Sequence, residues 1–280
     1  MTGAEWVALV FGVLLFVAIG SFMCVIIDRL PVHLDEPNEY GESWDTRPWG
    51  EVFGGNSRCS SCAAPVRPID NIPVFSWLIL RGKCRSCGER IPGFHPVVEL
   101  LCPLLFVGAL WAIGWSWLIL PALWLIPVGV AIAVIDLRTM IVPTRLVWPS
   151  LAVAVVLSVA AAVAVDELGR LAAATTGLVV LTAPLFLLWL AVPKGMGFGD
   201  VRLVTLLGWT VGFYAGTRPI QGAILVIVCL TVAAIVGIVV GVAALGARGR
   251  KAKVPFGPAL VTGAFFCIAF APQILEPFKL

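Results

Sequence analysis

Long apolar segments dominate this sequence of 280 residues, of which 60% are hydrophobic and 12% charged. Soluble domains carry roughly 25% charged residues, so this composition excludes an ordinary soluble fold. A helix needs about 20 apolar residues to cross the hydrocarbon layer of a bilayer. Eight segments approach or exceed this length: 6–27, 96–113, 117–135, 146–165, 171–192, 201–215, 220–245 and 257–274. We therefore expect an all-α polytopic membrane protein with about eight transmembrane helices embedded in a lipid bilayer.

The distribution of basic residues predicts how these helices are oriented. If the N-terminus lies outside, sixteen of the nineteen Lys and Arg residues fall in cytoplasmic segments. Such a bias is typical of cytoplasmic loops, so we expect the N-terminus outside. The net charge of +3 follows from this topology and does not indicate a nucleic-acid partner. Glu5 precedes the first apolar segment and Arg29 follows it, which is not the pattern of a cleaved signal peptide.

Four cysteines in the largest polar region predict a metal site. Cys59 and Cys62 form one CxxC pair, and Cys84 and Cys87 form a second pair after 21 residues. This spacing is typical of a structural zinc site with four thiolate ligands. Two disulfides are the alternative, but the predicted topology places this loop in the reducing cytoplasm, where disulfides rarely persist. The remaining cysteines lie within apolar segments and are expected to be small apolar fillers.

These features divide the chain into three predicted parts. Residues 1–30 form a first transmembrane helix, 31–95 a small cytoplasmic zinc-binding domain, and 96–280 a transmembrane core. Basic residues around the four cysteines either retain the loop in the cytoplasm or contact anionic headgroups. Glu99, at the start of the second span, either caps its helix through the favourable helix dipole or takes part in substrate handling.

A glycine-rich break at 194–200 separates two apolar segments and contains Asp200. A carboxylate at the edge of a membrane is costly and indicates a functional site with a partner. Asp136 ends the third predicted span, and two further spans return the chain to the same face before Asp200. Both carboxylates are therefore expected at the cytoplasmic face. Pro255 to Pro258, at the start of the last span, indicate the beginning of a helix.

Two neighbouring carboxyl groups that share one proton are the catalytic pair of aspartic peptidases. Gly195, Gly197 and Gly199 would allow positive φ and the close approach of an extended peptide, so we expect substrate-contacting backbone at Gly197 and Gly199. One alternative is an ion-coupled transporter or channel that uses the two aspartates as a cation or proton site. A scaffold protein, the third class, leaves the glycine-rich break and the aspartate pair unexplained.

Five motifs in order resemble the bacterial type IV prepilin peptidases, also called leader peptidase/N-methyltransferases, a family of GxGD-type membrane aspartyl proteases. They are Gly20 to Met23 with Arg29 to Pro31, the segment from Ser57 through Asp70 to Pro73 and on to Cys87, Asp136 with Ile141 and Pro143, Gly197 to Asp200, and Pro255 to Pro258. The resemblance covers nearly the whole chain. It implies Asp136 and Asp200 as the catalytic residues.

The resemblance also implies the reaction and its setting. The expected substrates are type IV prepilins or pseudopilins, whose short basic leader is removed just after a glycine at the cytoplasmic face of the bacterial inner membrane. The new N-terminus would then be methylated, with S-adenosylmethionine as donor. The sequence contains no glycine-rich Rossmann-type loop, so it does not predict which residues bind the methyl donor. It does not predict the oligomeric state either.

Overall fold

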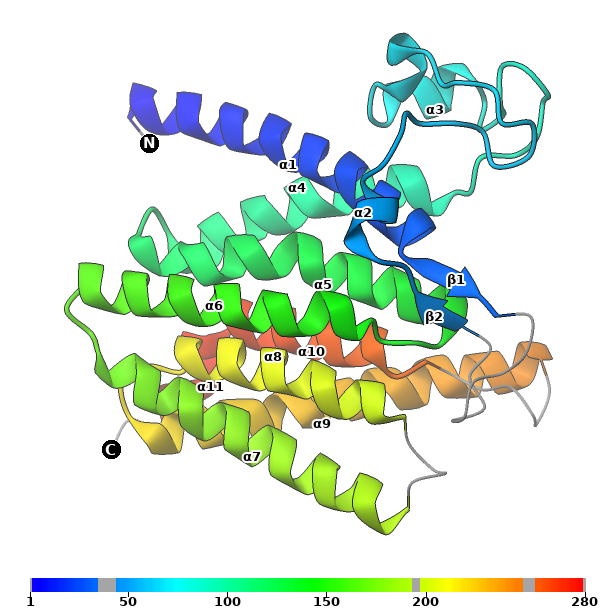
Figure 1. Ribbon diagram of the computed structural model, residues 1–280. Coiled ribbons are helices and arrows are strands. Elements are labelled where there is room, and N and C mark those ends of the chain that lie inside the picture. Colours follow the sequence, from blue (N-terminus) through cyan, green and yellow to red (C-terminus); the bar gives the residue numbers. More distant parts are fainter. Residues whose placement is uncertain (1, 35–43, 193–196, 249–254, 279–280) are drawn as a thin grey trace. The chain divides into compact units, whose positions relative to one another are not determined.

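The computed structural model describes residues 2–34, 44–192, 197–248 and 255–278, and the side chains of all of these except 244–248 (Figure 1). Internal contacts divide the chain into two compact units, Met1–Val107 and Gly108–Leu280. The division places the first helix and the cysteine-containing region in the same unit. The three-part organisation proposed from the sequence stays a prediction.

The first unit consists of two long helices and a small irregular region between them. Helix α1 begins after Thr2, whose side chain accepts a hydrogen bond from the Glu5 backbone while the Glu5 carboxylate accepts one from the Thr2 backbone. Two short antiparallel strands and short helices form the intervening region. Its elements, in order, are α1 (Gly3–Arg29), β1 (Pro31–His33), β2 (Trp44–Thr46), α2 (Trp49–Val52), η1 (Pro68–Asn71), α3 (Phe75–Ile79) and α4 (Phe94–Ile113), which continues past the boundary between the units.

Helices α1 and α4 pack closely. The rings of Phe16 and Phe106 stack with their centroids 4.8 Å apart. Gly20 lies against the α4 backbone, because a Cβ at this position would come within 3.0 Å of the Glu99 Cα. Such contacts between small residues and a facing backbone are typical of helix pairs in membranes, where lipid supplies little hydrophobic driving force.

The second unit is a bundle of helices with α8 at its centre (Figure 1). Helix α8 packs against α5, α6, α7, α9 and α10, and Leu203, Leu206 and Phe213 on it are completely buried. The elements are η2 (Trp117–Ile119), α5 (Leu120–Thr139), α6 (Thr144–Ala164), α7 (Gly169–Ala191), α8 (Phe198–Tyr214), α9 (Pro219–Arg248), α10 (Gly257–Ala269), α11 (Ala271–Leu275) and η3 (Glu276–Phe278).

Small residues bring α7 and α8 into close contact. Gly208 and Gly212 form a GxxxG pattern on α8 and face Gly177 of α7. A Cβ at Gly177 would lie 2.6 Å from the Gly208 carbonyl oxygen and 2.8 Å from the Gly212 Cα. Both neighbours are backbone atoms, so a side chain at Gly177 would force the helices apart.

All eight apolar segments form helices, which confirms the all-α membrane fold. Within the described part of the chain, six helices are long and apolar enough to cross a membrane. Counting α10 with α11 and η3 as one span bent by 76° makes seven. The remaining expected span, 201–215, corresponds to α8, whose 17 residues fall short of the usual spanning length of about 20. The chain is therefore a multi-pass membrane protein in which α8 is enclosed by other helices.

The α7–α8 contact yields a stability prediction. Gly177→Ala should destabilise the protein by about 1–3 kcal/mol, because the added methyl group meets backbone that cannot move aside cheaply. Thermal unfolding of the purified protein in detergent measures the change. Gly241→Ala on α9 is the matched control, because a Cβ there would meet no atom of the described residues within 4 Å. Equal unfolding temperatures for the two variants would contradict the proposed contact.

Candidate active site and metal centre

Asp136 lies in the last turn of α5 and is buried, with 4% of its surface exposed. The backbone N–H of Gly257, the first residue of α10, donates a hydrogen bond of 2.9 Å to its Oδ2 atom. The first N–H groups of a helix have no partner within the helix. This bond therefore gives a partner both to an N–H group at the start of α10 and to an oxygen of the buried carboxylate.

Helix α5 ends shortly after Asp136 because the chain turns at Met140. Met140 has a φ of 57° and caps the helix by donating its N–H to the Asp136 carbonyl oxygen at 2.8 Å. Its left-handed backbone stops the helix, and Pro143 precedes the start of α6. The chain thus leaves α5 within one turn of the carboxylate.

Asp200 occupies the first turn of α8 and is partly exposed. Helices α5 and α8 are in contact, and Asp136 and Asp200 lie close enough for their carboxyl groups to interact electrostatically. The neighbouring residue Gly199 explains how α8 approaches so closely. A Cβ at Gly199 would lie 2.9 Å from the Val142 Cβ, in the segment that follows α5.

The expected role of the glycines needs correction. Gly197 has a φ of −67° and an extended backbone, and Gly199 lies inside α8, so neither adopts positive φ. Gly199 is needed for close packing against Val142. Gly197 is exposed, and among the described residues beyond its chain neighbours the nearest atom to the position that a Cβ would take there is the Gly199 N, at 3.9 Å. Lys194 and Gly195 lie outside the described residues.

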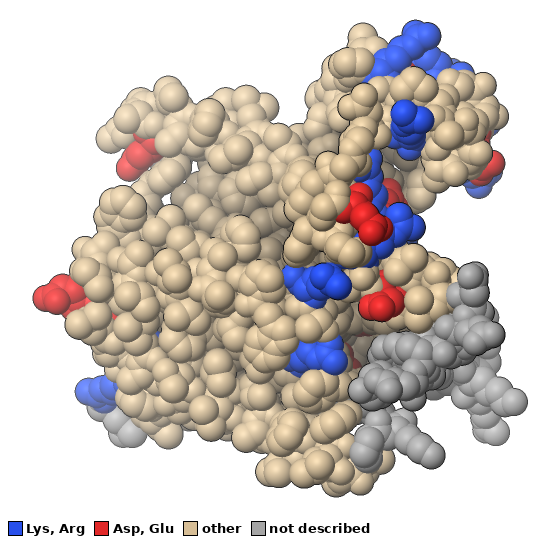
Figure 2. All heavy atoms as spheres, viewed as in Figure 1, with Lys and Arg blue, Asp and Glu red and all other residues tan. Residues whose placement is uncertain are grey.

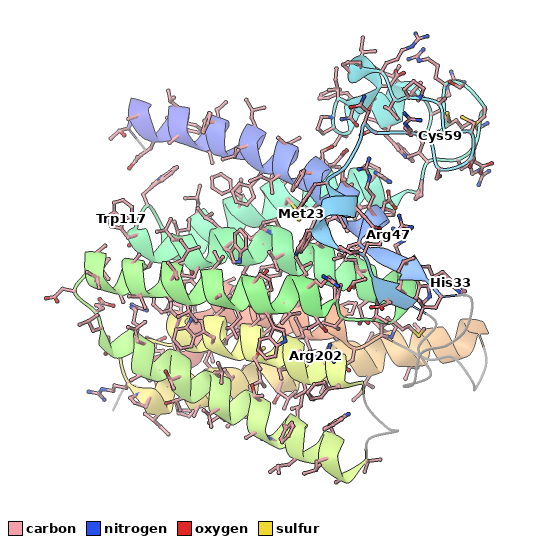
Figure 3. The ribbon with its side chains drawn as sticks, in the orientation of Figure 1. Met23, His33, Arg47, Cys59, Trp117 and Arg202 are labelled. Atoms are coloured by element: carbon pink, nitrogen blue, oxygen red, sulfur yellow. The ribbon has the colours of Figure 1, made fainter. Side chains whose placement is uncertain are left out.

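Arg202 lies on α8, two positions after Asp200, and the sequence predicted no role for it beyond topology (Figure 3). Its guanidinium group lies 4.7 Å from the centre of the Phe198 ring and donates a hydrogen bond to the Thr144 hydroxyl. The Phe198 ring also packs on Trp189 of α7 at 4.6 Å. These contacts attach the start of α8 to both α6 and α7. A basic residue two positions after Asp200 was the only sequence signal for this role.

Glu99 does not cap its own helix, which corrects one of its two expected roles. It lies beyond the first turn of α4 and is 7% exposed. Its Oε2 atom accepts a hydrogen bond of 2.6 Å from the Val74 N–H at the start of α3. Val74 has a φ of 63°, a rare and strained conformation for a β-branched residue. Glu99 therefore holds a strained turn of the cysteine-containing region against α4.

The four predicted cysteine ligands converge in the first unit, where Cys59 is labelled in Figure 3. The Sγ atoms of Cys59, Cys62, Cys84 and Cys87 all lie within 4.8 Å of one another, and those of Cys59 and Cys87 are 3.8 Å apart. Four thiolates bound to a tetrahedral zinc ion lie about 3.8 Å from each other, given Zn–S bonds of about 2.3 Å. The group can therefore hold a metal ion.

The two CxxC pairs adopt the same backbone structure. In the first, the Cys59 N–H donates a hydrogen bond to the Ala64 carbonyl, and the Cys59 carbonyl accepts one from the Ala63 N–H. In the second, the Cys84 N–H donates to the Glu89 carbonyl, and the Cys84 carbonyl accepts from the Gly88 N–H. The residue after each pair has positive φ, 56° at Ala63 and 74° at Gly88. An isolated bridge closes each turn, pairing Arg58 with Pro65 and Lys83 with Arg90. Two such equivalent turns are typical of a four-cysteine zinc site.

The thiol chemistry fits a bound cation. Hydrogen bonds from the backbone of Cys62 and then of Ser61 lower the pKa of the Cys59 thiol to about 6. A hydrogen bond from the Glu89 backbone lowers the pKa of Cys87, but desolvation and the neighbouring thiol groups outweigh it and raise that pKa to about 12. Four clustered thiolates repel one another without a cation. A divalent ion would remove this repulsion and allow all four to ionise.

Basic side chains are exposed at several places on the surface of the cysteine-containing region (Figure 2). Arg85, between Cys84 and Cys87, makes a bidentate ion pair with Asp70 of η1, with contacts of 2.6 and 2.9 Å. This pairing lowers the pKa of the Asp70 carboxyl. The exposed basic residues are Arg58, Arg67, Arg81, Lys83, Arg85 and Arg90. His95, near the start of α4, is close to a carboxylate of α1, since its Nε2 lies 3.0 Å from the Asp28 Oδ2.

Comparison with known families and proteins identifies the chain. Residues 14–113 match the bacterial peptidase A24 N-terminal domain, and residues 123–242 match the type IV leader peptidase family. No solved structure gives a significant match.

Three relatives are named prepilin leader peptidase/N-methyltransferase. The protein from Stutzerimonas stutzeri is 33% identical over 95% of this chain and 91% of its own length. The one from Neisseria gonorrhoeae is 31% identical over 88% of this chain and 85% of its own length, and the one from Bacillus subtilis is 28% identical over 95% and 94%. The chain therefore belongs to the type IV leader peptidase family.

Proposed function

We propose that this protein is a membrane aspartic endopeptidase that removes the leader from type IV prepilins or pseudopilins, with Asp136 and Asp200 as its catalytic pair. The observation that supports the proposal is the electrostatic proximity of a carboxyl group at the end of α5 to one at the start of α8, in a chain of this family. The exposed backbone at Gly197 would then contact the extended leader peptide. The family and the names of the relatives support the reaction and the class of substrate.

In the proposed mechanism the pair shares one proton. The Gly257 N–H favours negative charge on Asp136, because a backbone donor stabilises an ionised carboxylate. Asp136 would take a proton from the attacking water as the water oxygen bonds to the scissile carbonyl carbon. At the same time Asp200 would give its proton to the carbonyl oxygen. The proton on Asp136 would then pass to the amide nitrogen as the C–N bond breaks, while one hydroxyl group of the tetrahedral intermediate returns a proton to Asp200 and becomes the carbonyl of the new carboxyl group.

The four cysteines are proposed to hold one structural Zn²⁺. When bound, the ion would supply folding free energy to a region that has little apolar core of its own. Cys59, Cys62, Cys84 and Cys87 would be the ligands, and the matching turns around the two pairs support this assignment.

The second proposed activity is methylation of the new N-terminus, with S-adenosylmethionine as donor. It rests on the names of the relatives and on the match to the N-terminal domain of the family. The proposed setting is the bacterial inner membrane with the aspartates at the cytoplasmic face, which the charge bias of the sequence supports.

The transporter or channel alternative gains no support from the described structure. Ion sites of transporters are typically built near the membrane midplane from helices that are interrupted there. Asp136 and Asp200 instead lie at the end of α5 and the start of α8.

Replacing either aspartate tests the peptidase assignment. Asp136→Asn and Asp200→Asn should each lower the rate of leader cleavage by at least about 100-fold, because neither amide can exchange the shared proton. Cleavage of a purified prepilin by purified enzyme in detergent is measured by gel shift. Asp166→Asn is the matched control: Asp166 has a φ of 57°, which asparagine also tolerates, and it lies in the α6–α7 connection. Cleavage by either active-site variant at the wild-type rate would refute the assignment.

Elemental analysis tests the metal site. The purified wild-type protein should contain about one zinc per chain, as expected for a single four-cysteine site. A variant with Ser at Cys59, Cys62, Cys84 and Cys87 should contain none. Cys102→Ala is the control, because Cys102 is buried on α4 in the same unit and should not affect the metal content. Metal-free wild-type protein would contradict the proposal.

Mass measurement separates the two proposed activities. Incubation of the enzyme with a prepilin and S-adenosylmethionine should remove the mass of the leader and add the mass of one methyl group to the product. Without the donor, only the leader should be lost. A product that never gains a methyl group would refute the second activity and leave the first intact.

A further inference from the structure

The segment Pro255 to Pro258 starts the last span, and helix initiation alone does not explain its glycine. Pro258 is well suited to the first turn of α10, because a proline there gives up no hydrogen bond within the helix. Gly257 has no such role, since glycine is a poor helix residue. Its surroundings offer a different explanation.

Gly257 is in direct contact with the side chain of Asp136. A Cβ at Gly257 would lie 2.6 Å from the Asp136 Oδ2, 3.2 Å from its Cγ and 3.3 Å from its Cβ. The first of these distances is shorter than real Cβ contacts, so a side chain at Gly257 and the present position of the carboxylate are incompatible. Asp136 is 4% exposed and has little room to move away.

We propose that Gly257 is a positioning residue for the peptidase reaction. Its N–H donates to the Oδ2 of Asp136 at 2.9 Å, and its missing side chain lets the start of α10 lie directly against the carboxylate. One carboxylate oxygen is thereby held by the protein, and the other is left for Asp200, water or substrate. This inference rests on the proposed function only in naming the reaction that the geometry serves.

The effect on activity is tested with Gly257→Ala, which keeps the N–H but places a methyl group against the carboxylate. Displacement of a catalytic group by about 1 Å can cost roughly 100-fold in rate. We expect kcat for prepilin cleavage to fall about 10- to 100-fold, with KM changing less than about threefold, because the substrate-contacting backbone is unchanged. A kcat within about twofold of wild type would overturn the proposal.

Two alanine variants separate this effect from general damage to helix packing. Gly263→Ala lies on the same helix and would place its Cβ 2.7 Å from the Cys229 carbonyl oxygen, far along α10 from Asp136. It should lower the unfolding temperature while the folded enzyme keeps its kcat. Gly241→Ala, on α9, where a Cβ would meet no described atom within 4 Å, should leave kcat unchanged and should not lower the unfolding temperature. Loss of kcat in folded Gly263→Ala equal to that in Gly257→Ala would also overturn the proposal.

A double-mutant cycle on stability tests the contact without any enzyme assay. Asp136→Ala removes the carboxylate and leaves room for a methyl group at Gly257. Gly257→Ala should therefore lower the unfolding temperature in the wild-type background and much less in Asp136→Ala, whereas Gly263→Ala should cost the same in both. Equal costs of Gly257→Ala in the two backgrounds would refute the contact. Because this cycle needs no substrate, it distinguishes failure of the contact from failure of the peptidase assignment.

Discussion

A carboxylate buried among apolar helices must have hydrogen-bonding partners, and this requirement governs how the second unit is assembled around Asp136. Helix interiors offer no free donors, because their N–H groups are already paired. The start of a helix does, and α10 supplies the Gly257 N–H. The end of α5, the start of α10 and the start of α8 therefore meet around the carboxylate (Figure 1).

The close contacts between elements of the second unit depend on glycines, which have no side chain. Gly257 lies against Asp136, Gly199 against Val142, and Gly177 against the α8 backbone. In a membrane, helices associate through close van der Waals contact, so residues without a Cβ determine where backbones can touch. Gly197 and Gly199 of the GxGD motif were expected to allow positive φ, but neither adopts it. Gly199 instead leaves room for Val142.

The region between α1 and α4, in the first unit, depends on polar interactions for its organisation. The region between α1 and α4 is small, and its two CxxC turns place four thiol groups together. The Arg85–Asp70 ion pair links the second turn to η1, and Glu99 holds the strained backbone at Val74. The proposed metal ion and a few charged contacts would thus take the place of an extensive apolar core.

The sequence by itself determined the membrane-embedded helices and which four cysteines come together, and it predicted the pairing of Asp136 with Asp200. These features depend on local patterns: segment length, the CxxC spacing and the number of spans between two residues. Only the tertiary structure decided that Gly257, 121 positions from Asp136, is its hydrogen-bond donor, and that Glu99 binds Val74 instead of capping α4. Such contacts depend on the crossing angles and rotations of packed helices. Apolar segments with little amphipathic pattern do not encode these in any short stretch of sequence.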